Sequence, residues 1–215
     1  MTQDSATRIY CFLDFETSGI TLQDFPIQIG LLWTSYTIDK KTIICKELAQ
    51  YQSLIKIPRK YWKQVEKTYN RAEQIHHIPF SSIKQAPSPK TVLEQIFCIQ
   101  NKILSPSAQY SFACWNLGFD LMFWNRLLSL SSSDKQDLNK MFISRIDYHH
   151  LDVQSLYQIL PILTSEKELF KPQKLHLVHG EKFENAHEAI IDATITKKVF
   201  EKWLKKFVKP LTLVD

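Results

Sequence analysis

The sequence lacks long apolar runs, internal repeats and linker-like segments. None of its apolar stretches approaches the roughly 20 residues that span a bilayer, which excludes a transmembrane helix among them. The polar first residues also lack the basic-then-apolar layout of a secretory leader, so we expect none. We therefore expect one domain over residues 1–215, with residues 1–7 as a flexible tail.

Cysteine is scarce, and its spacing does not match a redox or zinc motif. The four cysteines include no C-x-x-C pair. Cys11 and Cys114 lie in apolar, strand-like runs, where a thiol packs as a small hydrophobe. We interpret all four as reduced core residues, and a disulfide between two of them is the alternative. Reduced thiols indicate a reducing compartment, so we expect the protein in the cytoplasm.

The chain has only a modest excess of positive charge. Its 27 Lys and Arg residues outnumber 22 Asp and Glu residues, for a net charge of +5. This bias suits a polyanionic partner but does not identify one. The densest basic stretch, residues 197–209, is typical of the solvated face of a last helix, with a phosphate-facing role as the alternative.

Apolar periodicity predicts strands first and then alternating helices and strands. The expected strands are residues 9–15, 27–37, 42–57, 110–115 and 142–148. The expected helices are residues 59–75, 88–104, 120–130, 152–160, 174–178 and 186–208. This order favours an α/β fold, in which a mixed sheet is flanked by helices and its early strands form an antiparallel meander.

Two acids lie within the first expected strand. Asp14 and Glu16 are two residues apart, so both carboxylates point to the same face. Like charges this close in an apolar run repel each other and lose hydration unless a cation lies between them. A divalent metal ion supplies that cation, and two ions about 4 Å apart can stabilise the attacking and leaving oxygens of a phosphodiester. The alternative is an edge strand with a solvated acidic face.

Asp120 is a lone acid among apolar neighbours. A buried carboxylate without a partner costs several kcal/mol or becomes protonated. Gly118, just before it, permits close backbone approach. The alternative is a helix N-cap or first-turn acid, which the helix dipole stabilises.

A last pair of candidates lies near the C-terminal helix. Asn185 and Glu188 have the spacing of a capping box, which places His187 in the first helical turn. His187 and Asp192 are then about 140° apart around an ideal helix. They share a site only if His187 leans out from the frayed helix start, where an imidazole could act as a mobile base. A surface histidine is the alternative.

Together these features resemble the DEDDh 3′-to-5′ exonucleases, a family that includes polymerase proofreading subunits, ribonuclease T and oligoribonuclease. The matches to its three motifs are Asp14, Glu16, Thr17, Ser18 and Gly19, then Asn116 and Asp120, then His187, Ala189 and Asp192. Residues 26–30 look like the second strand of the family, and residues 75–78 look like its His-Gly-Ile loop. His77 takes the place of the usual glycine, and we expect no metal pair from His76 and His77.

The resemblance implies a ribonuclease H-like five-stranded sheet and a two-metal-ion exonuclease. Two Mg²⁺ ions, for which Mn²⁺ would substitute, are expected on Asp14, Glu16, Asp120 and Asp192, with His187 as the base. The expected substrate is DNA or RNA with a free 3′ end, most simply single-stranded, and the products are nucleoside 5′-monophosphates. The expected substrate contacts are Thr17, Ile20, Asn116 and Phe119.

Two other functions are open at this stage. The fold could be a catalytically silent module that binds nucleic acid or protein, or the exonuclease could be a subunit recruited by a polymerase or an RNA-processing partner. A protein partner or a homodimer is compatible with the sequence, and a membrane partner is not expected.

Overall fold

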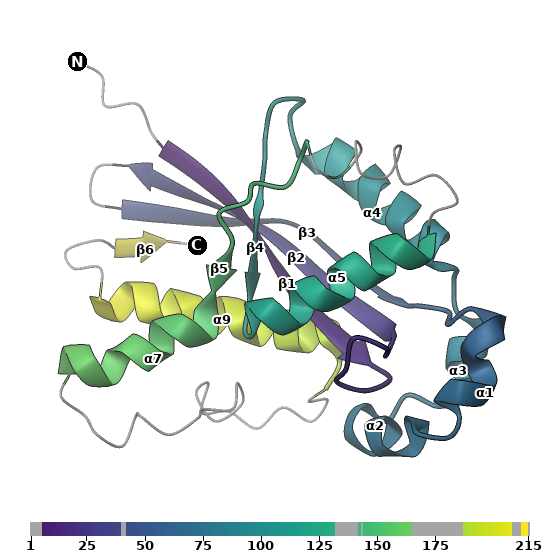
Figure 1. Cartoon of the computed structure of the whole chain (residues 1–215). Coiled ribbons are helices and arrows are strands. Elements are labelled where there is room, and N and C mark those ends of the chain that lie inside the picture. Colours follow the sequence, from purple (N-terminus) through teal and green to yellow (C-terminus); the bar gives the residue numbers. More distant parts are fainter. Residues whose placement is uncertain are drawn as a thin grey trace.

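A mixed β-sheet forms the centre of the protein (Figure 1). The computed structural model describes residues 6–39, 42–131, 142, 144–164, 187–207 and 212–214. The strands are β1 (Ala6–Thr17), β2 (Pro26–Asp39), β3 (Thr42–Leu54), β4 (Ser111–Cys114), β5 (Leu151–Asp152) and β6 (Thr212–Val214). They follow the order β5-β4-β1-β2-β3-β6, with β1 antiparallel to β2 and parallel to β4. The expected five-stranded mixed sheet is therefore confirmed, and β6 adds a sixth strand parallel to β3.

Helices cover both faces of the sheet because side chains alternate along its strands. Leu13 and Phe15 of β1 join the apolar cluster under α4 (Pro89–Ile103) and α5 (Leu117–Ser131). Phe12, which precedes Leu13 and points to the other face, joins the opposite cluster with α7 (Val153–Thr164) and α9 (Ala189–Phe207). Asp14 and Glu16 have the same parity as Phe12, so the alternation directs them towards the α9 face.

A third apolar cluster attaches a group of short helices to one end of the sheet. These are the 3₁₀ helix η1 (Arg59–Tyr61), α1 (Trp62–Val65), α2 (Tyr69–His76) and α3 (Phe80–Gln85). Phe25 and Ile27 near the start of β2 pack in the same cluster as Val65, Tyr69 and Ile83. Figure 1 shows α1, α2 and α3 together beyond the end of β1 and the start of β2.

The expected continuous helix over residues 59–75 is wrong because the chain turns between α1 and α2. The Thr68 backbone N–H and its hydroxyl both donate to the carbonyl of Val65, at 3.0 and 3.3 Å, which favours a turn over a continued helix. α2 then ends at His77, whose φ of 56° is left-handed. A glycine adopts this conformation without strain, so His77 has a backbone geometry that suits the glycine expected here from the resemblance.

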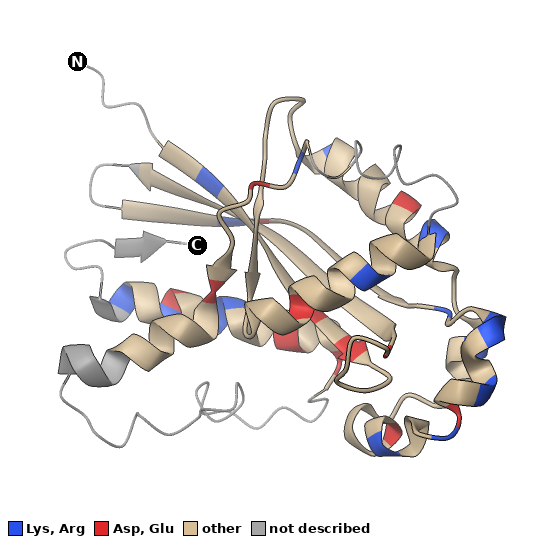
Figure 2. Ribbon diagram, in the orientation of Figure 1, with Lys and Arg blue, Asp and Glu red and all other residues tan. Residues whose placement is uncertain are grey.

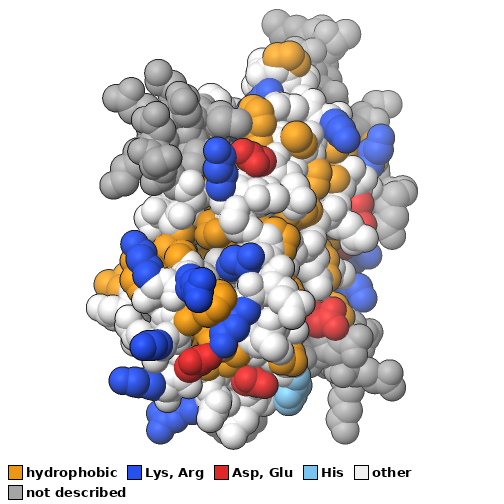
Figure 3. All heavy atoms as spheres, turned by 90° about the vertical axis from the view of Figure 1, so that its right-hand side faces the viewer, with side chains coloured by type: hydrophobic (Ala, Val, Ile, Leu, Met, Phe, Trp, Pro, Cys, Tyr) orange, Lys and Arg blue, Asp and Glu red, His pale blue; other side chains and the backbone are white. Residues whose placement is uncertain are grey.

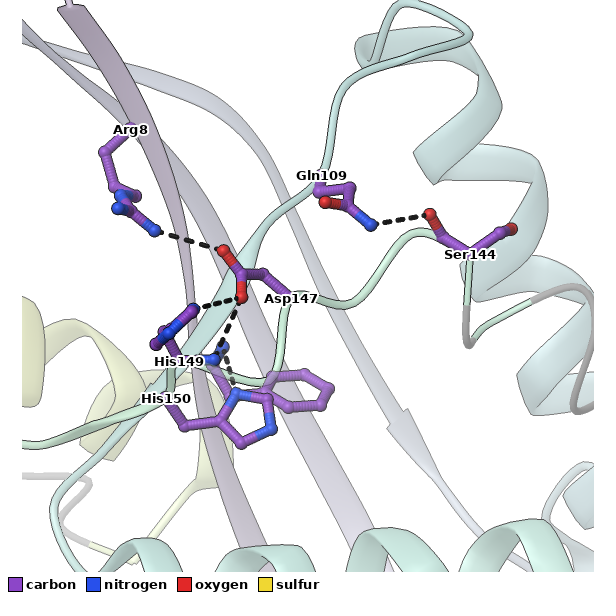
Figure 4. Close-up of polar contacts among 7 residues, drawn as sticks. Arg8, Gln109, Ser144, Asp147, His149 and His150 are labelled. Carbon is purple, nitrogen blue, oxygen red and sulfur yellow. Dashed lines mark hydrogen bonds and ion pairs between the residues drawn. The ribbon is translucent and has the colours of Figure 1, made fainter.

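The expected strand over residues 142–148 is also wrong. Phe142 is helical, and the following segment makes only an isolated bridge between Tyr110 and Ile146. Side chains hold this segment at the sheet edge (Figure 4): Asp147 accepts from Arg8 at 3.1 Å and from His149, and the Phe112 N–H donates to His150 Nδ1. The fifth strand begins later, as β5.

Other expectations about the elements have mixed outcomes. Ser88 caps α4 by accepting from the Thr91 N–H, as expected from the Ser88-Pro89 pair, and Asp152 caps α7 by accepting from the Ser155 N–H. Ala6 and Thr7, which were expected in the flexible tail, belong to β1. α9 begins at Ala189 and not at residue 186, while Asn185 and residues 174–178 lie outside the described residues.

The expectations for cysteine and for the basic C-terminal stretch are confirmed in part. All four cysteines are free, but Cys98 is exposed, so it is not a core residue. Lys197 is buried between Glu47 and Glu201, with an Nζ to carboxylate distance of 3.0 Å to each, and it is therefore not solvated. Lys198 and Lys202 are exposed, as expected. Within the described part of the chain, no helix is long and apolar enough to cross a bilayer.

Candidate active site

The two acids of β1 lie at the end of the strand, opposite small and polar residues of β2. Asp14 pairs with Gly30 and Glu16 with Gln28 in the antiparallel register, and a register shift follows between Glu16 and Thr17. Asp14 is partly buried, and Glu16 is 9% exposed. The alternation of β1 thus presents both carboxylates towards α9, as the spacing predicts.

The first turn of α9 packs directly on β2 at Gly30. A Cβ added to Gly30 would lie 2.3 Å from the Ile190 nitrogen and 2.3 Å from the Ala189 carbonyl carbon, a distance that real contacts do not tolerate. Gln28 completes the contact, because its Oε1 accepts from the Ala189 N–H at 3.0 Å. This side chain satisfies a backbone donor that helix starts leave open. The contact places Asp192, one turn into α9, beside the acids of β1.

His187 reaches the same place because it lies outside the helix. Its φ of 74° is left-handed, which is uncommon for a residue with a side chain and costs on the order of 1–3 kcal/mol. One ligand atom from each of Glu16, His187 and Asp192 lies within 4.8 Å of the other two. The expected first-turn position of His187 is therefore wrong, and the 140° separation in an ideal helix does not apply.

Asp120 joins the acids from a third element. It lies in the first turn of α5 and is 3% exposed. Asn116 begins this helix, since its carbonyl accepts from the N–H groups of Phe119 and Asp120 at 3.1 and 3.2 Å. Gly118 lies inside the first turn of α5, and not before the helix. Figure 2 shows acidic positions gathered where the end of β1 and the starts of α5 and α9 approach one another.

The carboxylates perturb one another strongly. Burial, followed by the charges of Asp120, Asp192 and Glu16, raises the pKa of Asp14 well above its usual value. Burial, followed by the charges of Asp192 and Asp120, raises the pKa of Glu16 to about 8. These effects require proximity, so the four acids form one cluster.

Two of these acids also have partners that favour the charged form. Burial raises the pKa of Asp192 to about 6, while the charge and backbone N–H of His187 lower it. Burial raises the pKa of Asp120 as well, against hydrogen bonds from the Phe15 backbone and the Cys114 thiol that lower it. The structure thus assembles four carboxylates and one imidazole from three distant parts of the sequence.

A groove of about 610 Å³ opens beside Glu16, between the loop after β1 and the helices α1 and α2. Its size falls within the range of small-molecule sites. Three of the four expected substrate contacts line it, namely Thr17, Ile20 and Phe119. Asn116 does not line the groove and serves instead to begin α5.

The loop after β1 is tied by several hydrogen bonds. The Thr17 hydroxyl donates to the Gly19 carbonyl at 2.6 Å, and the Asp24 carboxylate accepts from the backbone and hydroxyl of Thr21. Ile20, at the loop tip, is 80% exposed and stands at the groove. The loop therefore presents an apolar side chain to solvent on an ordered support.

Sequence reasoning missed four residues near the site. Gln28 and Gly30 position α9, but their importance follows only from the strand register, which sequence does not provide. His76 lines the groove, and burial, followed by the charges of His77 and His187, lowers its pKa to about 4. Asp152 lies close enough to raise the pKa of Asp120. Its capping position was visible in the sequence, but its proximity to Asp120 was not.

Gly30→Ala should push the start of α9 away from β2 without removing any polar group of the site. The added methyl group must displace backbone atoms of α9, so we expect the free energy of unfolding to fall by about 2–4 kcal/mol. Urea unfolding measures this loss. Gly118→Ala is the matched control, because its nearest contact for a new Cβ is 3.9 Å away, and it should not destabilise the protein. Equal stability of the two variants would contradict the close approach at Gly30.

Comparisons with known proteins support the fold. No family model matches the sequence, and no curated protein matches it by sequence. Among solved structures, cell-death related nuclease 4 (CRN-4) matches with a TM-score of 0.66 and 16% identity over 94% of this chain. The chain spans 64% of that structure, which is less than two thirds of its length. A full-length 3′-exonuclease matches with a TM-score of 0.59 and 11% identity, over 92% of this chain and 82% of its own length. The expected α/β fold, a mixed sheet flanked by helices in the ribonuclease H-like arrangement, is confirmed by these similarities.

Proposed function

We propose that this chain is a metal-dependent 3′-to-5′ exonuclease of the DEDDh type, formed as a single domain. The observation that carries the proposal is the convergence of Asp14, Glu16, Asp120, Asp192 and His187 beside one groove. The similarity of the fold to two nuclease structures, one of them a 3′-exonuclease, supports the same activity.

The chemistry of the cluster fits divalent metal ions. Carboxylate oxygens are the hard ligands that Mg²⁺ prefers. Four acids this close, three of them buried and Asp14 partly buried, are costly without a positive counter-charge. Asp14, Glu16 and Asp192 would hold one ion, and Asp14 with Asp120 a second. When bound, two such ions polarise the phosphodiester and lower the pKa of an attacking water. Mn²⁺ should substitute for Mg²⁺.

His187 is assigned the role of general base. Its imidazole lies near Glu16 and Asp192, so it can take a proton from a water held between these carboxylates and the scissile phosphate. The proton passes from the water oxygen to a ring nitrogen as the oxygen bonds to phosphorus and the phosphorus–O3′ bond of the penultimate nucleotide breaks. The O3′ oxygen leaves with the bonding electron pair and takes a proton from solvent, which gives the 3′-hydroxyl of the shortened strand. Hydrolysis in this direction releases a nucleoside 5′-monophosphate. The left-handed backbone at His187 holds the ring outside the helix, where it can meet that water.

The groove provides the site for the terminal nucleotide. Phe119 and Ile20 offer apolar surface on which a base can stack or rest, and Glu16 places the carboxylate cluster at the groove edge. A base splayed into such a groove must leave its helical stack, which favours a single-stranded 3′ end.

In the absence of metal, the protein should become more stable as the pH falls. Folded Glu16 and Asp192 have pKa values of about 8 and 6, while the unfolded residues titrate near 4.5 and 3.8, so the folded state binds more protons between these limits. Burial of His76, whose pKa falls to about 4 from an ordinary value of 6.5, opposes this trend because the unfolded imidazole binds a proton first. We expect the carboxylates to outweigh it, so that the free energy of unfolding in chelator rises by roughly 2–5 kcal/mol between pH 8 and pH 5. Denaturant titration over this pH range measures the change.

Neutralising one acid tests whether the clustered negative charges destabilise the folded protein. At pH 8 in chelator, Asp14→Asn should stabilise the protein, because it removes a charge that repels three others. Millimolar Mn²⁺ should raise the melting temperature of the wild type and have a smaller effect on Asp14→Asn. Glu94→Gln, which removes an exposed acid on α4, is the control. If neither pH nor Mn²⁺ changes the stability of the wild type, the result would contradict a cation site.

Activity requires a panel of labelled DNA and RNA strands, both single- and double-stranded. The wild type should release single nucleotides from the 3′ end in Mg²⁺ or Mn²⁺ and none in chelator. Asp14→Asn should lower the rate by at least about 10³-fold, because Asp14 is shared by both ions. Equal release by the wild type and Asp14→Asn would favour the silent binding module. Internal cleavage would indicate an endonuclease and contradict the proposed exonuclease.

A further inference from the structure

The whole net charge of the chain is concentrated in one short segment. Residues 56–85 contain seven Lys and Arg residues and two Glu residues, for a net charge of +5. The rest of the sequence contains 20 basic and 20 acidic residues, so it is neutral. This segment runs from the end of β3 through η1, α1, α2 and α3. The modest net charge of the whole chain therefore comes from one strongly basic segment.

Five of these basic side chains form an exposed surface, which we call the basic face. They are Arg59, Lys60, Lys63, Lys67 and Arg71. In the described residues none of the five forms an ion pair, whereas Lys84 neutralises Glu66 at 2.5 Å. Figure 3 shows Lys and Arg side chains gathered over this end of the molecule. The charges are thus available to an external anion.

Aromatic rings lie between the charges. The Lys60 ammonium lies 4.9 Å from the Tyr61 ring centroid, and the Arg59 guanidinium lies 6.0 Å from that of Trp62. Figure 3 shows apolar side chains among the cationic ones on this face. Rings interleaved with cations suit a nucleic acid strand, because bases stack on the rings while phosphates meet the charges.

The basic face continues directly into the groove. Arg71 lines the groove itself, together with Gln64 and Thr68, which are the sequence neighbours of Lys63 and Lys67. Glu16 lines the same groove and belongs to the carboxylate cluster. A polyanion on the basic face can therefore place one end at the carboxylates without crossing another part of the protein.

We propose that the basic face binds the phosphates of the nucleic acid strand on the 5′ side of the terminal nucleotide, so that the strand runs from the carboxylate cluster over α2 and α1 towards η1. This inference rests on the proposed function, since it takes the groove as the site of the 3′ end. On this proposal, α1, α2 and η1 determine the affinity for long strands, while the carboxylate cluster performs the hydrolysis. Binding there is electrostatic and independent of base sequence.

The test measures binding without hydrolysis. All variants carry Asp14→Asn, and a fluorescein-labelled 12-nucleotide single strand is titrated by fluorescence anisotropy in Ca²⁺ at several salt concentrations. Adding Lys60→Gln, Lys63→Gln and Lys67→Gln together should weaken the Kd about 10- to 100-fold at 0.1 M salt. The slope of log K against log salt should fall in magnitude by about 2, since each phosphate contact on a single strand contributes about 0.7.

A matched control has the same change in charge elsewhere. Lys90→Gln, Lys102→Gln and Lys202→Gln remove three exposed lysines from α4 and α9, and this variant should retain the Kd and the salt slope to within about twofold. Equal losses in the two triple variants would overturn the proposal, because net charge alone would then explain binding. Tighter binding of poly-glutamate than of the oligonucleotide would overturn it too, in favour of an acidic protein partner.

The outcomes separate this inference from the proposed function. If the wild type releases no nucleotide but the basic face still controls oligonucleotide binding, the enzyme proposal fails alone. If the wild type degrades strands and the basic-face variant binds them normally, the assignment of the basic face fails alone.

Discussion

The approach of α9 to β2 at Gly30 is the contact on which the candidate site depends. The strand offers two acids and the helix offers a third, but they meet only because the helix backbone lies within van der Waals distance of a residue without a side chain. Gln28 secures the helix start from the same strand. Two residues of β2, neither of them acidic, thus determine whether Asp192 and His187 reach Asp14 and Glu16.

The assembled cluster works against the stability of the fold that holds it. Burial raises the pKa values of all four carboxylates, and the charges of neighbouring acids raise those of Asp14, Glu16 and Asp120 further. The ionised cluster therefore costs folding free energy at neutral pH. The left-handed backbone of His187 adds strain at the same place. Such costs are typical of sites selected for chemistry, and a pair of divalent cations would convert the repulsion into attraction.

Sequence alone predicted which acids gather at the candidate site better than it predicted how they are brought together. Alternation in β1 placed Asp14 and Glu16 on one face, and burial of Asp120 followed from its apolar neighbours. The path of His187 could not be predicted, because the capping-box spacing indicated a helix that begins earlier than α9 does. The contact at Gly30 depends on the strand register, and the distance from Asp152 to Asp120 depends on how β5 lies beside β4. These are long-range properties that local patterns do not contain.

The fold was predicted in outline, and its two errors have different causes, one of them a set of tertiary contacts and the other a local hydrogen bond. The apolar run near residue 146 forms a single bridge because side chains of Arg8, Asp147 and His150 hold it as an irregular segment. The helix expected from residue 59 divides at Thr68, which bonds back to Val65. The sequence places the net charge of +5 in residues 56–85, but the exposed face formed by the basic residues becomes clear only because η1, α1 and α2 lie together at one end of the sheet.

Locating bound metal ions tests most directly whether the four carboxylates form a two-metal site. A crystal soaked in Mn²⁺ and measured at the manganese absorption edge should give two anomalous peaks about 4 Å apart, with the Asp14 carboxylate between them. One peak should contact Glu16 and Asp192, and the other should lie beside Asp120. Crystals that show no peak at these carboxylates, with Asp120 or Asp192 directed away from Asp14, would contradict the account.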